Sequence, residues 1–404
     1  MIKGTFPIEK FRELETPFYY YDMKVLRDTL DTIKKEVSKY ENFHVHYAIK
    51  ANANPKILKV IREAGLGADC VSGGEVRASV EAGFPNDKIV FAGVGKTDKE
   101  INYALDHDIF CFNVESIPEL EVINELAARE GKVARVCLRI NPDVEAHTHT
   151  HIITGMAENK FGIALKDMLQ VVQLAQQLSN ISFVGLHFHI GSQITNMHDF
   201  VSLCERINEI QHLLHKHGIY PMVINVGGGL GIDYQSPSEH PIADFKAYFR
   251  VFTQHLHLRP EQSLHFELGR SVVAQCGSLI TRVLYVKQAA TKQFAIVDAG
   301  MTELIRPALY QAKHTIHYLS PLNCQLPTSK YDIVGPICES SDVFDKDVLL
   351  PVTQRGDLLA IRSAGAYGES MASTYNCRPL PPYYTDEELD LSVQLNKLYE
   401  TLQK

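Results

Sequence analysis

The segment HVHYAIKANANP, residues 44–55, sets the pattern for the rest of the chain. It predicts a short buried strand that stops at the turn-forming residues Asn52, Asn54 and Pro55 and presents Lys50 at its C-terminal end. Burial disfavours the charged form of an amine, and a neutral lysine can attack a carbonyl group and form a Schiff base. The alternative is a lysine whose long side chain simply reaches solvent from the strand end. Whether Lys50 is reactive or simply solvent-exposed has to be judged from residues elsewhere in the chain.

Similar strand segments recur along the sequence. Apolar, β-branched stretches begin near residues 44, 67, 89, 110, 134, 183, 222 and 263. Helix-like stretches lie between them, at 55–64, 74–82, 117–129, 165–178, 197–217 and 242–256. Eight strands that alternate with helices over about 230 residues predict a (β/α)8 TIM-like barrel. A doubly wound sheet is the alternative, although no strand is followed by the turn typical of dinucleotide sites.

The pattern changes after about residue 275. Segments 278–287, 293–299, 331–335 and 357–363 are extended and separated by turns, which predicts a mostly β C-terminal domain. We expect the strand at 16–22 to join it, so that residues 27–275 form the barrel and residues 1–26 with 276–404 form the β-rich domain. Residues 386–402 predict an amphipathic helix.

Composition narrows the class of protein. The chain has 404 residues, 45% of them hydrophobic and 22% charged, as in an ordinary globular protein. The formal net charge of -8 and the lack of a basic run argue against nucleic acid as a partner. Eight cysteines without CxxC pairs indicate reduced thiols, and no run is long enough to cross a membrane. We therefore expect a cytoplasmic protein.

Polar residues gather where the predicted barrel strands end. In such barrels the C-terminal ends of the strands carry the active site. The residues placed there are Lys50, Asp69 with 72–74, Asn141, His189 with Gly191 and Ser192, Gly227–Gly229, and Glu267 with Arg270.

Each of these groups has more than one interpretation. The glycine run 227–229 lets backbone N–H groups approach a phosphate, or forms no more than a tight turn. His187 and His189 share a strand face and could bind a metal, but the rim offers no obvious set of further ligands. His189 could instead stack on an aromatic cofactor or be a hydrogen-bonded core histidine. Glu267 could pair with a protonated pyridine nitrogen or with Arg270.

Three further segments carry candidate residues. His147, His149 and His151 alternate in a long insertion, where a lid is favoured over a zinc site. Arg306 and Tyr310 are four residues apart, and Pro307 suits the first turn of a short helix, so the pair could clamp a carboxylate. The turns 335–342 and 364–368 present Cys338 beside Glu339, and Tyr367.

Together these motifs, from YAIKAN at 47–52 to YNCRP at 375–379, resemble the barrel-type (fold type III, alanine racemase-like) pyridoxal-phosphate enzymes. Within that group they most closely resemble the diaminopimelate decarboxylase family. The resemblance covers nearly the whole chain, with seven motifs in the same order. It implies pyridoxal 5'-phosphate as the cofactor and the decarboxylation of meso-2,6-diaminopimelate to L-lysine and CO2, the last step of lysine biosynthesis.

The resemblance also implies a role for each matching residue. Lys50 would be the Schiff-base lysine, Cys338 would protonate the intermediate, and Glu267 would keep the pyridine nitrogen protonated where racemases of this fold place an arginine. The implied cofactor-binding residues are Lys50, His189, Ser192, Gly227, Gly228, Gly229, Glu267, Gly269, Arg270 and Tyr367. The implied substrate-binding residues are Arg270, Arg306, Tyr310, Glu339 and Tyr367.

In this family Cys338 and Glu339 would reach the site from the partner subunit, which implies a homodimer with shared active sites. Two positions depart from the family pattern, Leu268 where a proline is usual and Glu369 where an apolar residue is usual. The alternatives are a decarboxylase of carboxynorspermidine, ornithine or arginine, a non-catalytic regulatory relative, and a metal-dependent hydrolase that uses His187 and His189.

Overall fold

The computed structural model describes residues 6–144, 160–319 and 327–390, which form two compact units. One unit comprises Leu30–Gly231 and Asp244–Val272, and the other comprises Met1–Thr29, Ile232–Ala243 and Val273–Lys404. The predicted lid histidines 147, 149 and 151, and the end of the predicted C-terminal helix from 391, lie outside the described residues.

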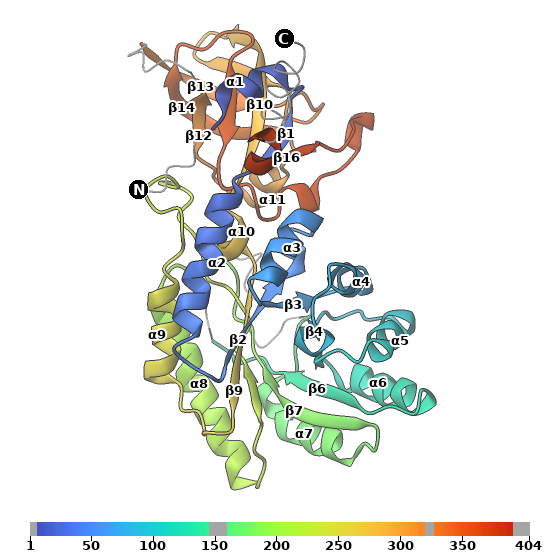
Figure 1. The fold of residues 1–404 in the computed structure, drawn as a ribbon. Helices are drawn as coiled ribbons and strands as arrows, with labels where there is room; N and C mark the ends of the chain where they lie inside the picture. The colour runs from blue at the N-terminus through green and yellow to red at the C-terminus, as the bar shows by residue number, and fades with distance from the viewer. Residues whose placement is uncertain (1–5, 145–159, 320–326, 391–404) are drawn as a thin grey trace, which may run out of the picture. The chain divides into compact units, whose positions relative to one another are not determined.

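The first unit is built around a closed barrel of eight parallel strands (Figure 1). Its strands are β2 Phe43–Ala48, β3 Gly67–Cys70, β4 Ile89–Phe91, β5 Cys111–Val114, β6 Ala134–Arg139, β7 Ile181–His187, β8 Val223–Asn225 and β9 Ser263–Leu268. The pairing of β2 with β9, which sets Phe43 opposite Leu264, closes the barrel. The predicted (β/α)8 fold is confirmed, and because all eight strands are parallel their C-terminal ends share one rim.

Helices cover the outside of the barrel in Figure 1. They are the C-terminal part of α2 Met23–Val37, then α3 Pro55–Glu63, α4 Gly73–Glu81, α5 Asp98–Asp106, α6 Ile117–Arg129, α7 Met168–Gln177, α8 Met197–Lys216 and α9 Phe245–His255. Local sequence fixes where they start: Asn54 caps α3 ahead of Pro55, and Thr97 with Glu100 forms a capping box on α5. The predicted helix 165–178 begins with a 3-10 turn, η4 Leu165–Asp167, before α7.

Aromatic packing on the outer face of β9 determines where the Glu267 carboxylate points. Phe266 points outward and packs against Tyr248, Phe249 and Phe252 of α9, with ring centroids 5.0 to 5.7 Å apart. Successive strand residues face opposite sides, so Glu267 points into the barrel. The packing of Phe266 on the outside of the barrel therefore directs the Glu267 side chain to the inside.

The second unit is mostly β-sheet. Its eight-stranded sheet contains β1 Phe18–Tyr21, β10 Gly277–Gln288, β11 Gln293–Val297, β12 Ile316–Leu319, β13 Thr328–Val334, β14 Val343–Pro351, β15 Leu358–Ile361 and β16 Tyr383–Thr385. Strand β1 pairs antiparallel with β10 and parallel with β16, so the N-terminal strand joins the C-terminal sheet as predicted. A core of Phe11, Phe18, Tyr20 and Ile280 joins the helix α1 Ile8–Glu13 to this sheet.

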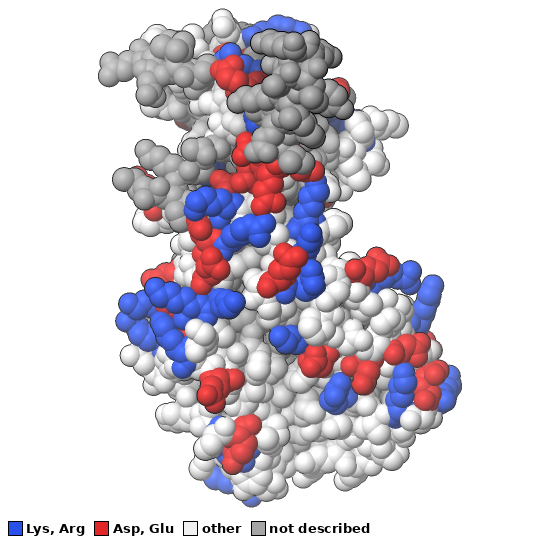
Figure 2. Space-filling view, in the orientation of Figure 1, with Lys and Arg blue, Asp and Glu red and all other residues white. Residues whose placement is uncertain are grey.

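The surface carries charges of both signs. On the face drawn in Figure 2, Lys and Arg side chains lie next to Asp and Glu and form no continuous basic stripe. Within the described ranges, no helix is both long enough and apolar enough to cross a membrane.

Candidate active site

Lys50 lies just beyond the first barrel strand. Strand β2 ends at Ala48, and the lysine sits in a 3-10 turn, η1 Ile49–Ala51, instead of at the strand end itself. Its Nζ is 3.7 Å from Oδ2 of Asp69 in β3, and its side chain is 41% exposed while that of Asp69 is 1% exposed. The amine is therefore partly exposed and lies beside a buried carboxyl group. This arrangement is intermediate between the buried lysine and the solvent-exposed lysine that the sequence allowed.

Asp69 is an unusual carboxyl group. Burial, and then the negative charge of Glu267, raise the pKa of Asp69 to about 8 despite the nearby Lys50 amine. Neither of its side-chain oxygens accepts a hydrogen bond from the described residues. The side chain beside the lysine is therefore predominantly uncharged at neutral pH in the protein without ligand.

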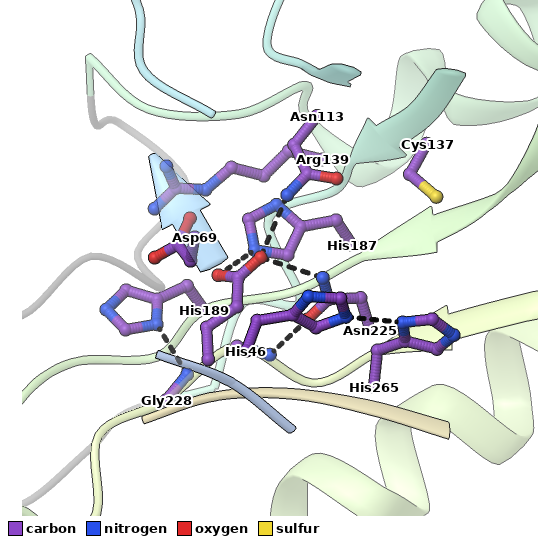
Figure 3. Close-up of polar contacts among 12 residues, drawn as sticks. His46, Asp69, Asn113, Cys137, Arg139, His187, His189, Asn225, Gly228 and His265 are labelled. Atoms are coloured by element: carbon purple, nitrogen blue, oxygen red, sulfur yellow. Dashed lines mark hydrogen bonds and ion pairs between the residues drawn. The ribbon is translucent and has the colours of Figure 1, made fainter. Parts of the chain in front are cut away.

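Glu267, in contrast, is a carboxylate with several donors. Asn113 of β5 and Asn225 of β8 donate to its Oε1 over 2.9 and 2.7 Å, and His187 of β7 donates from Nε2 to its Oε2 over 3.0 Å (Figure 3). Burial by itself would raise the pKa of Glu267. The interaction with His187, and then the positive charge of Lys50, outweigh burial, so that the pKa of Glu267 lies below its usual range. The site thus holds a buried anion at neutral pH.

His189 presents a neutral ring near this anion. The Gly228 N–H donates to its Nδ1 over 3.3 Å, as Figure 3 shows, so the ring proton lies on Nε2. Burial and the positive charges of Arg139 and Lys50 lower the pKa of His189 well below its usual value. A half-buried neutral imidazole offers a flat face on which an aromatic ring can stack.

The glycine turn packs too closely for side chains. A Cβ on Gly228 would lie 1.9 Å from the backbone oxygen of Glu267, and one on Gly229, where φ is +107°, would lie 2.7 Å from that of Gly191. The Ile194 N–H donates to the Gly229 carbonyl over 2.8 Å, so the loop at 191–194 lies against the turn. Glycine is needed here because the backbones of neighbouring strand ends meet.

Arg270 supplies a cation to the same rim. The residue is buried, begins the short helix α10 Arg270–Val273, and donates from Nη2 to the Ser192 hydroxyl over 2.9 Å. A Cβ on the preceding Gly269 would lie 3.1 Å from the Cβ atoms of Ala48 and Ala51, so this glycine lets the end of β9 pack against the turn that carries Lys50. An arginine and a hydroxyl beside a glycine turn form a suitable site for a phosphate.

These residues fit one kind of cofactor. Lys50 offers an amine for a carbonyl group, Glu267 an anion for a basic ring nitrogen, His189 a flat face, and Arg270 with Ser192 a place for a phosphate. This combination fits pyridoxal phosphate. Among the residues in the described ranges, no group of three or more His, Cys, Asp or Glu side chains could hold a metal ion.

The other predicted residues belong to the β-rich unit. Arg306 begins the helix α11 Arg306–Tyr310 and is buried. Its Nη1 donates to the Tyr234 hydroxyl over 3.0 Å and to Nε2 of His314 over 2.8 Å, while His314 donates from Nδ1 to the Arg362 carbonyl. These contacts fix the direction of the guanidinium group. Tyr310 is half-buried four residues further along the same short helix.

Cys338 and Glu339 are exposed on a loop of this unit. The Tyr375 hydroxyl donates to Oε1 of Glu339 over 2.7 Å, and the Cys338 N–H donates to Oδ1 of Asn376 over 3.3 Å. The thiol and carboxyl groups are therefore held in a fixed loop while staying open to solvent.

The small-residue turn at 364–368 holds Tyr367 in the left-handed region, with φ +57°. Gly365 in this turn lies so close to Val273 that a Cβ would be 2.0 Å from its carbonyl oxygen. Of the two departures from the family pattern, Leu268 is fully buried at the end of β9, and Glu369 accepts a hydrogen bond from the Tyr21 hydroxyl.

Sequence reasoning missed several residues at these sites. Asn113 and Asn225 were not singled out, and His187 was considered only as a metal ligand. A signal was available, because an asparagine inside an apolar strand such as 223–226 needs a buried hydrogen-bond partner. Tyr234 and His314 offered no such local signal, since their role depends on contact with Arg306.

Known proteins are similar to this chain over most of its length. Residues 25–274 match the family model described as "Pyridoxal-dependent decarboxylase, pyridoxal binding domain". A diaminopimelate decarboxylase of Bacteroides thetaiotaomicron is 64% identical over 388 residues, which cover 96% of this chain and 100% of the relative. A diaminopimelate decarboxylase of Helicobacter pylori strain J99 is 43% identical over 92% of this chain and 90% of its own.

Solved structures are similar in the same way. The crystal structure of diaminopimelate decarboxylase from Helicobacter pylori complexed with L-lysine has a TM-score of 0.87 and 40% identity, covering 93% of each chain. The arginine decarboxylase of Paramecium bursaria Chlorella virus has a TM-score of 0.80 over 94% of this chain and 98% of its own. At 21% identity the latter shows the fold alone.

Proposed function

This chain belongs to the family of pyridoxal-dependent decarboxylases, and on that premise we propose that it converts meso-2,6-diaminopimelate to L-lysine and CO2. The observation that carries the choice of substrate is the 64% identity, over 96% of the chain, to a relative named diaminopimelate decarboxylase. The enzyme is thus a carboxy-lyase that depends on pyridoxal 5'-phosphate.

We propose that the barrel rim holds this cofactor. Lys50 attaches it covalently, His189 stacks on its ring, and Glu267 accepts a hydrogen bond from its ring nitrogen. Ser192, Gly227, Gly228, Gly229 and Arg270 bind the phosphate, and Gly269 and Tyr367 complete the proposed cofactor set. Support comes from the buried anion at Glu267, the neutral imidazole of His189 and the paired Arg270 and Ser192.

When bound, the cofactor supplies an electron sink for the electron pair that remains as CO2 leaves. The protein contributes a negative charge near the ring nitrogen and positions the reacting amine. Glu267 keeps a negative charge where positive charge on the ring nitrogen is needed, and Lys50 would hold the cofactor through its amine. Asp69 lies beside that amine as a carboxyl group that can give up or take a proton near neutral pH.

We propose that residues of the β-rich unit recognise the substrate. Arg306 and Tyr310 bind a carboxylate, and Glu339 receives the distal ammonium group, while Arg270 and Tyr367 complete the set. Cys338 returns a proton to the carbon that lost CO2. The support is the buried, aimed guanidinium of Arg306 and the accessible thiol and carboxyl groups of the loop that carries Cys338.

The proposal extends to assembly and location. Residues 27–275 act as the cofactor-binding barrel, and residues 1–26 with 276–404 supply substrate and dimer contacts. Leu309, Tyr375 and Leu380 are exposed in this second region, and we propose that a second copy covers part of it in a homodimer. The described cysteines are free thiols, in keeping with a cytoplasmic enzyme.

A substrate panel tests the proposed function. CO2 release is measured from meso-diaminopimelate, ornithine, arginine and carboxynorspermidine, each with and without added pyridoxal phosphate. We expect release from diaminopimelate only, dependent on the cofactor and insensitive to chelators. Preference for ornithine or arginine would contradict the substrate, and activity that needs a metal but no cofactor would contradict the reaction class.

A further inference from the structure

The Glu267 carboxylate is held by three donors from three different strands. Its Oε1 accepts from Asn113 and Asn225, and its Oε2 accepts from His187, whose side chain is 2% exposed beside the 6% of Glu267. The two asparagines carry no charge. The charge state of His187 therefore decides the net charge of this buried cluster.

The hydrogen bonds of His187 indicate which nitrogens carry protons. A carboxylate can only accept, so Nε2 must carry the proton that it donates to Glu267. The second nitrogen, Nδ1, is buried, and the described residues provide it with no hydrogen-bond partner. A charged ring would bury an unsatisfied N–H at Nδ1, which costs free energy in addition to that of desolvating the cation.

Charged groups of both signs lie around His187. Lys50 and Arg139 are cations that act on the neighbouring His189, and Arg139 is itself bonded to Glu115 over 2.9 Å. The anion that faces the ring is Glu267, whereas the nearby Asp69 is predominantly uncharged. Glu267 attracts a positive charge at His187 and the two cations oppose it, so the unpartnered Nδ1 decides in favour of the neutral ring.

Neutral donors help to keep Glu267 ionised. Glu267 accepts three hydrogen bonds, and hydrogen bonds to a charged group are stronger than those between neutral groups. They offset part of the cost of burying the carboxylate. Lys50 adds its positive charge to these donors, so the anion does not depend on a positive charge at His187 as well.

We propose that His187 is a positioning residue that donates from a neutral Nε2–H tautomer and so leaves the full negative charge of Glu267 available to the cofactor ring. This rests on the proposed function, in which Glu267 meets the ring nitrogen. A cationic His187 would neutralise Glu267 and remove its preference for a protonated ring. Among the described residues Oε2 accepts one hydrogen bond against two at Oε1, which leaves an acceptor position for the ring N–H.

Nitrogen NMR of the full chain tests the charge state directly. Histidine-labelled protein is examined at pH 7, loaded with pyridoxal phosphate and again with the cofactor removed, and the His187 signals are assigned by their loss in His187→Gln. We expect a protonated Nε2 and an unprotonated Nδ1 in both forms. Protons on both nitrogens at pH 7 would overturn the proposal. The result is independent of turnover, so it can be read even if the substrate panel refutes the function.

Two variants test the role of the neutral donor. His187→Leu removes the donor, and we expect kcat to fall about 10- to 100-fold with little change in KM. His187→Gln keeps a neutral N–H and should restore most of kcat, whereas a site that needs a cation would not be rescued by the amide. His265→Gln alters another buried histidine of the same barrel, bonded to His46 and Ser263, and should change thermal stability while kcat stays within about twofold. A failed rescue in a folded His187→Gln protein contradicts the proposal.

Discussion

Asp69→Asn tests the electrostatics of the lysine site most sharply. The carboxyl group is buried, and its pKa rises from the model-peptide value of 3.8 to about 8. At about 1.4 kcal/mol per tenfold change in proton affinity, this corresponds to about 6 kcal/mol as a ceiling. Water and side-chain rearrangement screen buried charges, so we expect about 2 to 4 kcal/mol to be measured.

The sign follows from the direction of the pKa change. Between about pH 4 and pH 8 the folded protein binds a proton at Asp69 that the unfolded chain has released, so the free energy of unfolding falls as the pH rises. The amide has nearly the same shape and cannot ionise. Asp69→Asn should therefore be close to wild type in stability near pH 4 and increasingly more stable towards pH 8.

Thermal unfolding of the cofactor-free protein provides the assay. Midpoint temperatures are compared between variant and wild type from pH 5 to pH 9. The transition of the barrel is followed separately, because the two units need not unfold in one step. The difference should grow with pH by several degrees and level off above pH 8. Asp87→Asn is the matched control at an exposed aspartate, and its difference should not vary with pH. A difference that is flat for Asp69→Asn, or shrinks as pH rises, would refute the reasoning.

Three further substitutions probe the substrate, the fold and the anion. Arg306→Ala should raise KM for diaminopimelate about 30- to 1000-fold without weakening cofactor binding, and an equal loss of both would make the arginine structural. Gly228→Ala forces a Cβ to within 1.9 Å of a backbone oxygen and should lower the barrel's thermal midpoint by several degrees, whereas Gly74→Ala, with its nearest neighbour at 3.6 Å, should not. Glu267→Gln should lower kcat about 100-fold or more at pH 7 while cofactor absorbance remains, and an unchanged kcat would mean that the charge is not needed.

The repeating pattern predicted the fold well, because strand and helix periods are local properties of the chain. The eight barrel strands begin close to their predicted positions, and Glu267 in β9 and His189 just after β7 lie near the strand ends where the sequence placed them. Three strands of the β-rich sheet, β12, β14 and β16, were not predicted. They are short or exposed along part of their length, so their apolar signal is weak.

The site was harder to predict in detail, since it depends on contacts between distant strands. Lys50 was placed at a strand end, whereas it lies in the 3-10 turn Ile49–Ala51 that follows β2. The donors to Glu267 come from positions 42 to 154 residues away, and only closure of the barrel brings them together. A buried asparagine in an apolar strand is the only sign of such contacts in the local sequence, because its side chain needs a hydrogen-bond partner.

Chemical mapping of the cofactor attachment tests the central claim most directly. The chain loaded with pyridoxal phosphate is reduced with borohydride, digested, and its modified peptide is identified by mass spectrometry, with Lys50→Ala treated in parallel. We predict that the phosphopyridoxyl group lies on Lys50 and that the variant carries none and loses the visible absorbance of the bound cofactor. A group found on another lysine of a preparation that decarboxylates diaminopimelate would contradict the site proposed for this chain.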